Sequence, residues 1–176
     1  MSKRNVGLCI SLIVLAACEG GGDGIAQQQP EPIDITCDST SVLENGACRV
    51  VAERIDARAT TPFTEDGDPV ELEVVLFKPL QGERFPLLVV NHGSTGNGSD
   101  PSRFGDTFTH KPTVLHFVER GWMVAFPQRR GRGQSDGLYD EGFTANRSGY
   151  SCDATTALAG ADRALDDLDA VTDWLR

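Results

Sequence analysis

The chain has 176 residues, of which 39% are hydrophobic and 24% are charged, a balance typical of a globular protein. This composition excludes wholesale disorder and collagen-like repeats, and the length allows at most one compact domain. Sixteen Lys and Arg against 26 Asp and Glu give a formal net charge of −10. Such a surface repels nucleic acid and anionic lipid headgroups, so we expect neither as a partner.

The first residues have the pattern of an export signal. Lys3 and Arg4 precede an apolar run over residues 6–17 that is too short to span a bilayer as a stable helix. The run ends in Leu-Ala-Ala-Cys at residues 15–18, which resembles the lipobox of bacterial lipoproteins. The resemblance implies a lipoprotein signal peptide over 1–17 and a thioether-linked diacylglycerol on Cys18. Ordinary cleavage after Ala17 is the alternative.

Residues 18–35 are rich in Gly, Gln and Pro, which predicts a flexible tether. Acyl chains on Cys18 would hold the protein on a lipid bilayer while the tether leaves the folded part in water. Glu19 follows the cysteine, where Asp retains some lipoproteins at the inner membrane. We therefore expect an exported protein that is lipid-anchored to a bacterial membrane, on the outer-membrane or periplasmic side.

Two cysteines bracket a predicted hairpin over residues 36–50. Asn45-Gly46 favours a tight type I′ turn, and the flanking strands would bring Cys37 and Cys48 together in an oxidising compartment. We predict a Cys37–Cys48 disulfide, with two unpaired cysteines in a disordered tail as the alternative. Cys152 is left over, which indicates a free thiol, an intermolecular bridge or a partner outside this sequence.

The pattern of a packed domain begins at residue 51. Residues 51–59 are a weaker strand candidate, and residues 65–68 form a turn. Residues 70–77 alternate and then become apolar, which indicates a strand with one wet face or near a sheet edge, stopped by Pro79.

Two continuous apolar runs, 86–90 and 122–126, predict strands covered on both faces, as in a parallel sheet. Helical spacing over residues 113–120, with Gly121 as the C-terminal cap, joins them into a βαβ unit.

Residues 153–175 predict the longest helix, with Asp153 as its N-cap. Apolar residues recur at steps of three and four: Leu158, Ala161, Leu165, Leu168, Val171 and Leu175. The sequence stops after this helix, although an α/β pattern calls for another parallel strand. We therefore expect the strand over 122–126 to keep an uncovered edge and the apolar stripe of the helix to be only partly packed.

Two motifs carry a family resemblance. Residues 85–96 read Phe-Pro-Leu-Leu-Val-Val-Asn-His-Gly-Ser-Thr-Gly, and residues 119–137 contain an Arg-Gly-x-Gly-x-Ser loop after a strand. Together, over residues 65–176, they look like the first half of an α/β-hydrolase, most similar to dienelactone-hydrolase and prolyl-oligopeptidase-type members. The resemblance implies an α/β fold: a truncated hydrolase domain over 51–176 with the N-terminal strands and helices of a mostly parallel sheet and without the C-terminal half.

The resemblance also implies an oxyanion-hole loop made of His92, Gly93, Ser94 and Thr95. In the family, a backbone N–H of this loop stabilises the negative charge that develops when a serine attacks a carbonyl. By position the donor is Ser94, with Thr95 second, while His92 and Gly93 shape the turn. The alternative is a Gly- and Ser-rich surface loop over 91–100.

Ser135 lies in Gly-Gln-Ser-Asp-Gly, which matches the nucleophile pattern of the family. However, residues 127–134 separate Ser135 from the preceding strand, and residues 138–151 have loop composition. His92, His110 and His116 all precede Ser135, so the order Ser, Asp, His cannot be built. We interpret Ser135 as a structural residue, with a nucleophile as the alternative, and we expect no catalytic triad in this chain.

Other chemistries find little support. His110 and His116 lack the spacing of a zinc motif, and residues 131–133 lack the Lys-Ser/Thr of a phosphate loop, so we expect no metal and no cofactor. Arg129, Arg130 and Arg132 could contact an acidic substrate near the pocket mouth, but surface or intraprotein salt bridges are the favoured interpretation.

These patterns lead to two hypotheses. The first is the N-terminal portion of an exported, lipid-anchored serine hydrolase that acts on small-molecule esters or peptides when full-length and is inert alone. The second is a non-catalytic surface lipoprotein or binding domain derived from a hydrolase.

Overall fold

The computed structural model describes residues 36–176. The predicted signal peptide, the tether and Cys18 lie outside the described residues. Across residues 36–176, no helix combines the length and the apolar character needed to cross a bilayer.

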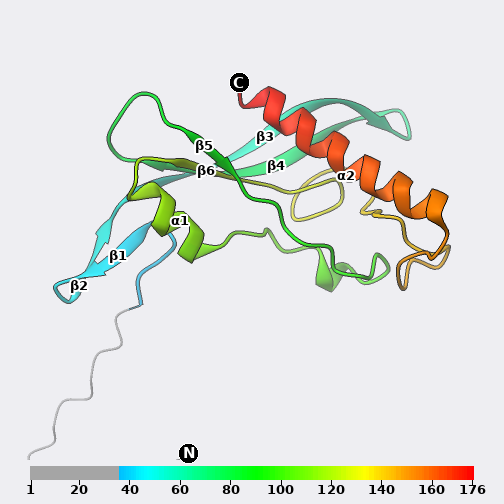
Figure 1. The fold of residues 1–176 in the computed structure, drawn as a ribbon, viewed down its shortest axis with the longest axis horizontal. Coiled ribbons are helices and arrows are strands. Elements are labelled where there is room, and N and C mark those ends of the chain that lie inside the picture. Colours follow the sequence, from blue (N-terminus) through cyan, green and yellow to red (C-terminus); the bar gives the residue numbers. More distant parts are fainter. Residues whose placement is uncertain (1–35) are drawn as a thin grey trace, which may run out of the picture. The chain divides into compact units, whose positions relative to one another are not determined.

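The described chain forms two sheets and two α-helices (Figure 1). The strands are β1 (Ser41–Glu44), β2 (Ala47–Val50), β3 (Ala52–Glu65), β4 (Asp68–Pro79), β5 (Leu87–Val89) and β6 (Met123–Pro127). The helices are α1 (Lys111–Val118) and α2 (Ala154–Trp174), with a short 3₁₀ turn at Pro101–Arg103. β1 pairs with β2, and the larger sheet has the order β3-β4-β6-β5.

The two helices cover opposite faces of the four-stranded sheet (Figure 1). Successive side chains of a strand point to opposite faces. Val75 and Phe77 of β4 therefore join Val114 and Val118 of α1 in one core. Leu72, Val74 and Leu76 of the same strand join Val171 of α2 in the other. The predicted α/β class is confirmed as three layers, helix on sheet on helix.

The predicted βαβ unit is confirmed, but the sheet is not mostly parallel. β5 and β6 are parallel and α1 connects them. β4 is antiparallel to both β3 and β6, so among the described strands only one of the three pairings in this sheet is parallel. The tight turn at Asp66 and Gly67, where φ is 52° and 93°, returns the chain directly and forces the antiparallel β3–β4 pair.

The prediction of a wet face or a sheet-edge position for β4 is wrong. β4 lies inside the sheet and is almost completely buried. Its alternation comes from Glu71 and Glu73, and of these Glu73 is only 8% exposed. The Glu73 carboxylate is buried because a hydroxyl and a backbone N–H from other loops donate hydrogen bonds to it.

The expected uncovered edge of the strand over 122–126 is also not observed. β6 is paired on both sides, with β4 and with β5, so the outer strands of this sheet are β3 and β5. β5 is accordingly only half-buried, although Leu88 and Val90 pack on the α1 side and Leu87 and Val89 on the α2 side.

Helix α2 begins where predicted, because Asp153 Oδ2 accepts a hydrogen bond from Thr156 N at 2.8 Å. The predicted apolar stripe, however, is buried only toward its C-terminal end. Leu158 and Leu165 are 64% and 56% exposed, whereas Gly160, Asp167 and Val171 are buried. The first half of α2 packs through Gly160 on the backbone of Glu141 and Gly142, where a Cβ would meet atoms at 2.1 Å. The second half buries Val171 against the sheet, and Arg163 in the first half forms an ion pair with Glu65 at the end of β3.

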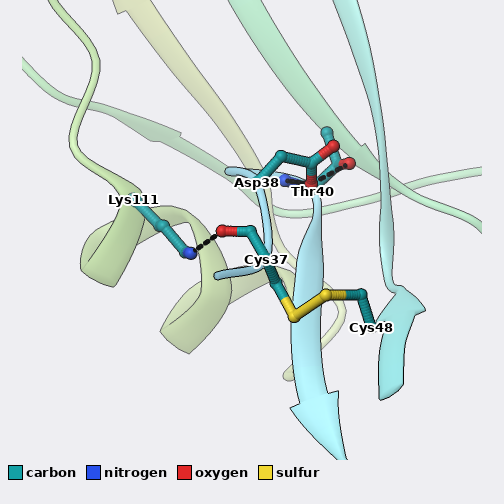
Figure 2. The surroundings of a disulfide bond; sticks show 5 residues. All are labelled: Cys37, Asp38, Thr40, Cys48 and Lys111. Carbon is teal, nitrogen blue, oxygen red and sulfur yellow. Dashed lines mark hydrogen bonds between the residues drawn. A yellow bond between two sulfur atoms is a disulfide. The ribbon is translucent and has the colours of Figure 1, made fainter. Parts of the chain in front are cut away.

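The predicted hairpin and its disulfide are confirmed. Asn45 and Gly46 have φ of 51° and 75°, the left-handed pair of a type I′ turn, and Cys37 is bonded to Cys48. Figure 2 shows the Lys111 side chain of α1 reaching the carbonyl oxygen of Cys37, to which its Nζ donates a hydrogen bond. The segment before β1 is thereby held on helix α1.

Candidate functional site

Two loops meet at the carboxyl edge of the β5–β6 pair. We call residues 90–110, between β5 and α1, the β5 loop, and residues 128–139, after β6, the β6 loop. Because β5 and β6 are parallel, both loops leave the sheet at the same edge, the usual position of a site in an open α/β sheet. The predicted oxyanion residues lie in the β5 loop and Ser135 lies in the β6 loop.

His92 is a buried structural residue, 4% exposed. Its Nε2 accepts a hydrogen bond from Arg129 N at 3.3 Å, so the ring proton resides on Nδ1, which donates to Gly93 O at 2.9 Å. Burial, together with the charges of Arg129 and Arg132, lowers the pKa of His92 to about 4. The imidazole is therefore neutral at pH 7. Its hydrogen bond from Arg129 N connects the β5 loop to the β6 loop.

Ser94 and Thr95 present their backbone N–H groups differently. Thr95 N donates to the hydroxyl of Tyr139 at 3.1 Å. Ser94 is exposed, and its N–H has no hydrogen-bond partner among residues 36–176. The Ser94 side chain also contacts the Tyr139 hydroxyl, at 3.2 Å between the oxygens. Of the two predicted donors, only Ser94 offers a free N–H in this conformation.

Tyr139 was not indicated by the sequence, yet it joins the two loops. It is 2% exposed, and its hydroxyl donates to Glu141 Oε2 at 2.9 Å while it accepts from Thr95 N. Its ring packs against Phe104 of the β5 loop, with 4.7 Å between ring centroids. Tyr139 lies 44 residues from Thr95 in a stretch of loop composition, so no local pattern could have revealed this contact.

Gly131 of the Arg-Gly-x-Gly-x-Ser motif is required by a close approach of the backbone. Its φ is 70°, and a Cβ at this position would lie 2.1 Å from Tyr139 N. Gly131 N also donates to Asp136 O at 2.9 Å, which closes the loop on itself. The motif thus forms a tight loop that places Tyr139 in contact with the β5 loop.

Ser135 is engaged in structural hydrogen bonds on both sides. Its Oγ donates to Gln128 O at 2.6 Å and accepts from Glu73 N at 2.8 Å. The neighbouring Asp136 carboxylate accepts from Glu71 N at 3.0 Å. Ser135 therefore pins the β6 loop to strand β4, and no histidine contacts it among the described residues.

Buried polar side chains complete the joint between the loops. Gln128 is fully buried, and its side-chain amide accepts from Phe108 N at 2.8 Å and donates to Phe108 O at 2.9 Å, as a neighbouring strand would. The Glu73 carboxylate accepts from Thr107 Oγ1 at 2.8 Å and from Gln134 N at 2.7 Å. Both residues satisfy loop backbone or hydroxyl groups that would otherwise be buried without partners.

The three arginines of the β6 loop differ in their partners. Arg129 forms an ion pair with Glu141, and the guanidinium of Arg130 lies 2.6 Å from Asp167 on α2. Burial raises the pKa of Asp167 although Arg130 opposes this shift. The favoured interpretation as internal ion pairs is thus confirmed for Arg129 and Arg130. Arg132 is 7% exposed and forms no ion pair with a described residue.

The remaining candidates lie elsewhere. His110 begins helix α1, with its Nδ1 2.7 Å from Thr113 Oγ1, and His116 lies exposed on the same helix. Within residues 36–176, no group of three His, Cys, Asp or Glu side chains could hold a metal ion. Cys152 is exposed and forms no disulfide with a described residue.

In chemical terms the site offers a hydrogen-bond donor and a positive charge. The exposed N–H of Ser94 can donate to an anionic oxygen, and Arg132 lies in the loop opposite. Within these two loops, the hydroxyls of Ser94 and Ser135 contact no histidine.

The depressed pKa of His92 predicts a pH-dependent stability. Its folded-state pKa of about 4 lies below the ordinary 6.5, so the unfolded chain binds more protons between these values, and stability falls as the pH falls through this window. The loss due to His92 amounts to about 3 kcal/mol between pH 7 and pH 4. Urea unfolding at a series of pH values gives the slope of the unfolding free energy against pH. Between pH 7 and pH 4 the fall in this free energy should be smaller by this amount in His92→Gln, whereas His116→Gln, which changes an exposed ring, should keep the wild-type slope. Equal slopes in wild type and His92→Gln would contradict the neutral, buried imidazole.

No family model and no curated protein matches the chain. Among solved structures, it is similar to an α-amino acid ester hydrolase at 18% identity and a TM-score of 0.34, covering 66% of this chain and 17% of that one. It is also similar to an acetyl xylan esterase from a Thermoanaerobacterium species at 18% identity and a TM-score of 0.35, covering 70% and 39%. An aminopeptidase from a marine-sediment thaumarchaeon follows at 13% identity and a TM-score of 0.35, covering 78% and 21%. The chain spans less than two fifths of the length of each of these structures.

Proposed function

We propose that this chain supplies the oxyanion-holding part of an exported, lipid-anchored serine hydrolase that cleaves ester or peptide bonds through an acyl-enzyme. The observation that carries the proposal is the backbone N–H of Ser94, an exposed residue in the loop after β5, which has no described partner. In hydrolases of this type, one oxyanion donor comes from the loop between the third strand and the first helix of the sheet. β5 is the third strand of the larger sheet in chain order, and α1 is the helix that follows it.

The same proposal assigns no catalytic step to the described residues by themselves. Ser135, the one match to the nucleophile pattern, uses its hydroxyl to hold β4 and β6 together. A serine attacks a carbonyl at neutral pH only when a base removes its proton, and here the Ser135 proton is directed at Gln128 O. These 176 residues alone are therefore inert toward esters.

The engaged Ser135 also favours the second candidate, a non-catalytic lipoprotein that uses the same loops to bind a ligand. The two candidates make different predictions for the native membrane. Proteins that contain these residues form an acyl-enzyme there under the first candidate and form none under the second. They share the export signal and the lipid on Cys18, which we propose as the membrane anchor.

A fluorophosphonate probe separates these possibilities. The purified chain is expected to remain unlabelled, both as wild type and as Ser135→Ala. That substitution should lower the free energy of unfolding by about 1–3 kcal/mol, because Glu73 N and Gln128 O lose their partner. Label on the wild-type chain that disappears in Ser135→Ala would make Ser135 a nucleophile and overturn this part of the proposal.

In native membranes, the serine-hydrolase proposal predicts that mass spectrometry finds peptides of this chain in a labelled species. If its peptides occur only in unlabelled protein while other membrane hydrolases are labelled, the non-catalytic candidate replaces the first one.

The lipid anchor is tested by cell fractionation in a diderm bacterial host. Wild type is expected in the membrane fraction, with a mass increase on Cys18, because two or more acyl chains bind a bilayer stably. Cys18→Ser should appear in the soluble fraction or as uncleaved precursor, while the control Cys152→Ser should stay with the membrane. A soluble wild-type protein cleaved after Ala17 would contradict the anchor.

A further inference from the structure

Four large apolar side chains are exposed at the edge of the sheet opposite the candidate site. β3 and β6 begin and β4 ends at this edge, and the β1–β2 hairpin joins the sheet here because it directly precedes β3. The exposed side chains, which we call the apolar end, are between 36% and 59% exposed: Leu43, Val50, Leu80 and Trp122. A single exposed apolar residue needs no explanation, but a connected group of them calls for a partner.

The apolar end is a connected surface. Leu43 and Val50 are diagonal neighbours on one face of the hairpin, because Val50 lies two positions beyond the residue that pairs with Leu43. Val50 and Leu80 line the same pocket of about 540 Å³. Gly121, which directly precedes Trp122, lines this pocket too. The four side chains therefore surround one hollow between the hairpin, the end of β4 and the turn before β6.

Charge distinguishes this end from the rest of the described chain. Residues 36–53, 78–86 and 111–122, which form it, contain five Asp or Glu and five Lys or Arg. The other described residues contain 17 acidic and nine basic side chains, so they carry the whole formal net charge of −8. An anionic bilayer repels that remainder but does not repel the charge-balanced apolar end.

The proposed lipid on Cys18 would attach to the chain at this same end. Residue 36, the first described residue, directly precedes the hairpin, so the chain that leads from Cys18 enters the domain here. Figure 1 shows the hairpin and α1 at one end of the described chain and the first turns of α2 at the other. An anchor on Cys18 therefore presents the apolar end to the bilayer and keeps the start of α2 away from it.

We propose that the apolar end docks on the surface of the lipid bilayer and inserts its side chains between the headgroups and the acyl chains. Trp122 suits this boundary, because an indole ring is apolar while its N–H can bind headgroups or water. The inference deepens the proposed membrane anchor and rests on it. It adds an orientation, in which the candidate site at the opposite edge of the sheet faces water.

Tryptophan quenching by lipids brominated on their acyl chains tests this orientation. The chain contains two tryptophans, Trp122 at the apolar end and Trp174 on α2, which is 39% exposed. The chain from residue 18, which the proposed cleavage would leave, carries Cys18→Ser and an N-terminal histidine tag. A nickel-chelating lipid holds it on vesicles of phosphatidylethanolamine and phosphatidylglycerol. Because this attachment needs no acylation, a failure of the proposed lipid on Cys18 would not change the result.

The two tryptophans should respond differently. Trp174→Phe, which keeps Trp122, should lose about half of its fluorescence on brominated compared with unbrominated vesicles, because interfacial side chains reach about 5–10 Å into the acyl boundary. Trp122→Phe, which keeps Trp174, should retain its fluorescence. Leu80→Asp in the Trp174→Phe chain should abolish the quenching, because a charge is costly at this depth. The matched control Leu158→Asp, at an exposed leucine of α2, should leave the quenching unchanged.

Three results would overturn the proposal. They are Trp122 fluorescence that brominated lipid does not change, equal quenching of Trp122 and Trp174, and equal quenching in the Leu80→Asp and Leu158→Asp chains. If Trp122 is unquenched and the chain sediments as a dimer that Leu80→Asp dissociates, a second copy of the chain covers the apolar end instead of the bilayer.

Discussion

The buried hydroxyl of Tyr139 is the contact on which the candidate site depends. A phenol in the protein interior has to use its donor and its acceptor, and here it donates to Glu141 and accepts from Thr95 N. The bond from Thr95 N joins the β5 loop to the β6 loop, and the bond to Glu141 satisfies the hydroxyl proton. Because Thr95 N is used in this way, the preceding N–H of Ser94 is the one left exposed and available.

Around this contact, the loops are held by polar groups that the sheet supplies. Glu73 extends from β4 to Thr107 and Gln134, and Ser135 returns a hydrogen bond to β4. Gln128 continues β6 and pairs with the backbone of Phe108. A broken member of such a network leaves the others buried without partners, which favours a single loop conformation. The arrangement explains how an irregular segment with many glycines can hold a site in place.

Arg130 and Asp167 attach helix α2 to this region. The pair is buried, and Asp167 also accepts from Arg130 N at 2.9 Å. The guanidinium carbon of Arg130 also lies 4.5 Å from the ring centroid of Phe63 on β3. A buried pair of this kind contributes little net stability, but it specifies which turn of the helix meets the loop. This contact explains why helix α2 exposes Leu158 and Leu165 to solvent and buries Asp167.

Local patterns predicted the elements well, because their causes are local. The Asn45-Gly46 turn, the Asp153 cap and the apolar run of β6 each depend on a few neighbouring residues. The errors arose where a polar residue is buried by a distant partner. Glu73 made β4 resemble a half-exposed strand, although this residue is only 8% exposed. In the site, His92 to Thr95 were predicted from a motif, but the role of Tyr139 depends on a contact with Thr95, 44 residues away, which no periodicity encodes.

The central claim is that Tyr139 holds the β5 loop in a conformation that engages Thr95 N and leaves Ser94 N free. Amide hydrogen exchange of the purified chain, followed by NMR at these two residues, tests it most directly. We expect rapid exchange at Ser94, protection at Thr95, and loss of the Thr95 protection in Tyr139→Phe, which removes only the hydroxyl. Protection of Ser94 in wild type, or a Thr95 amide that exchanges equally fast with and without the Tyr139 hydroxyl, would contradict this account of the site.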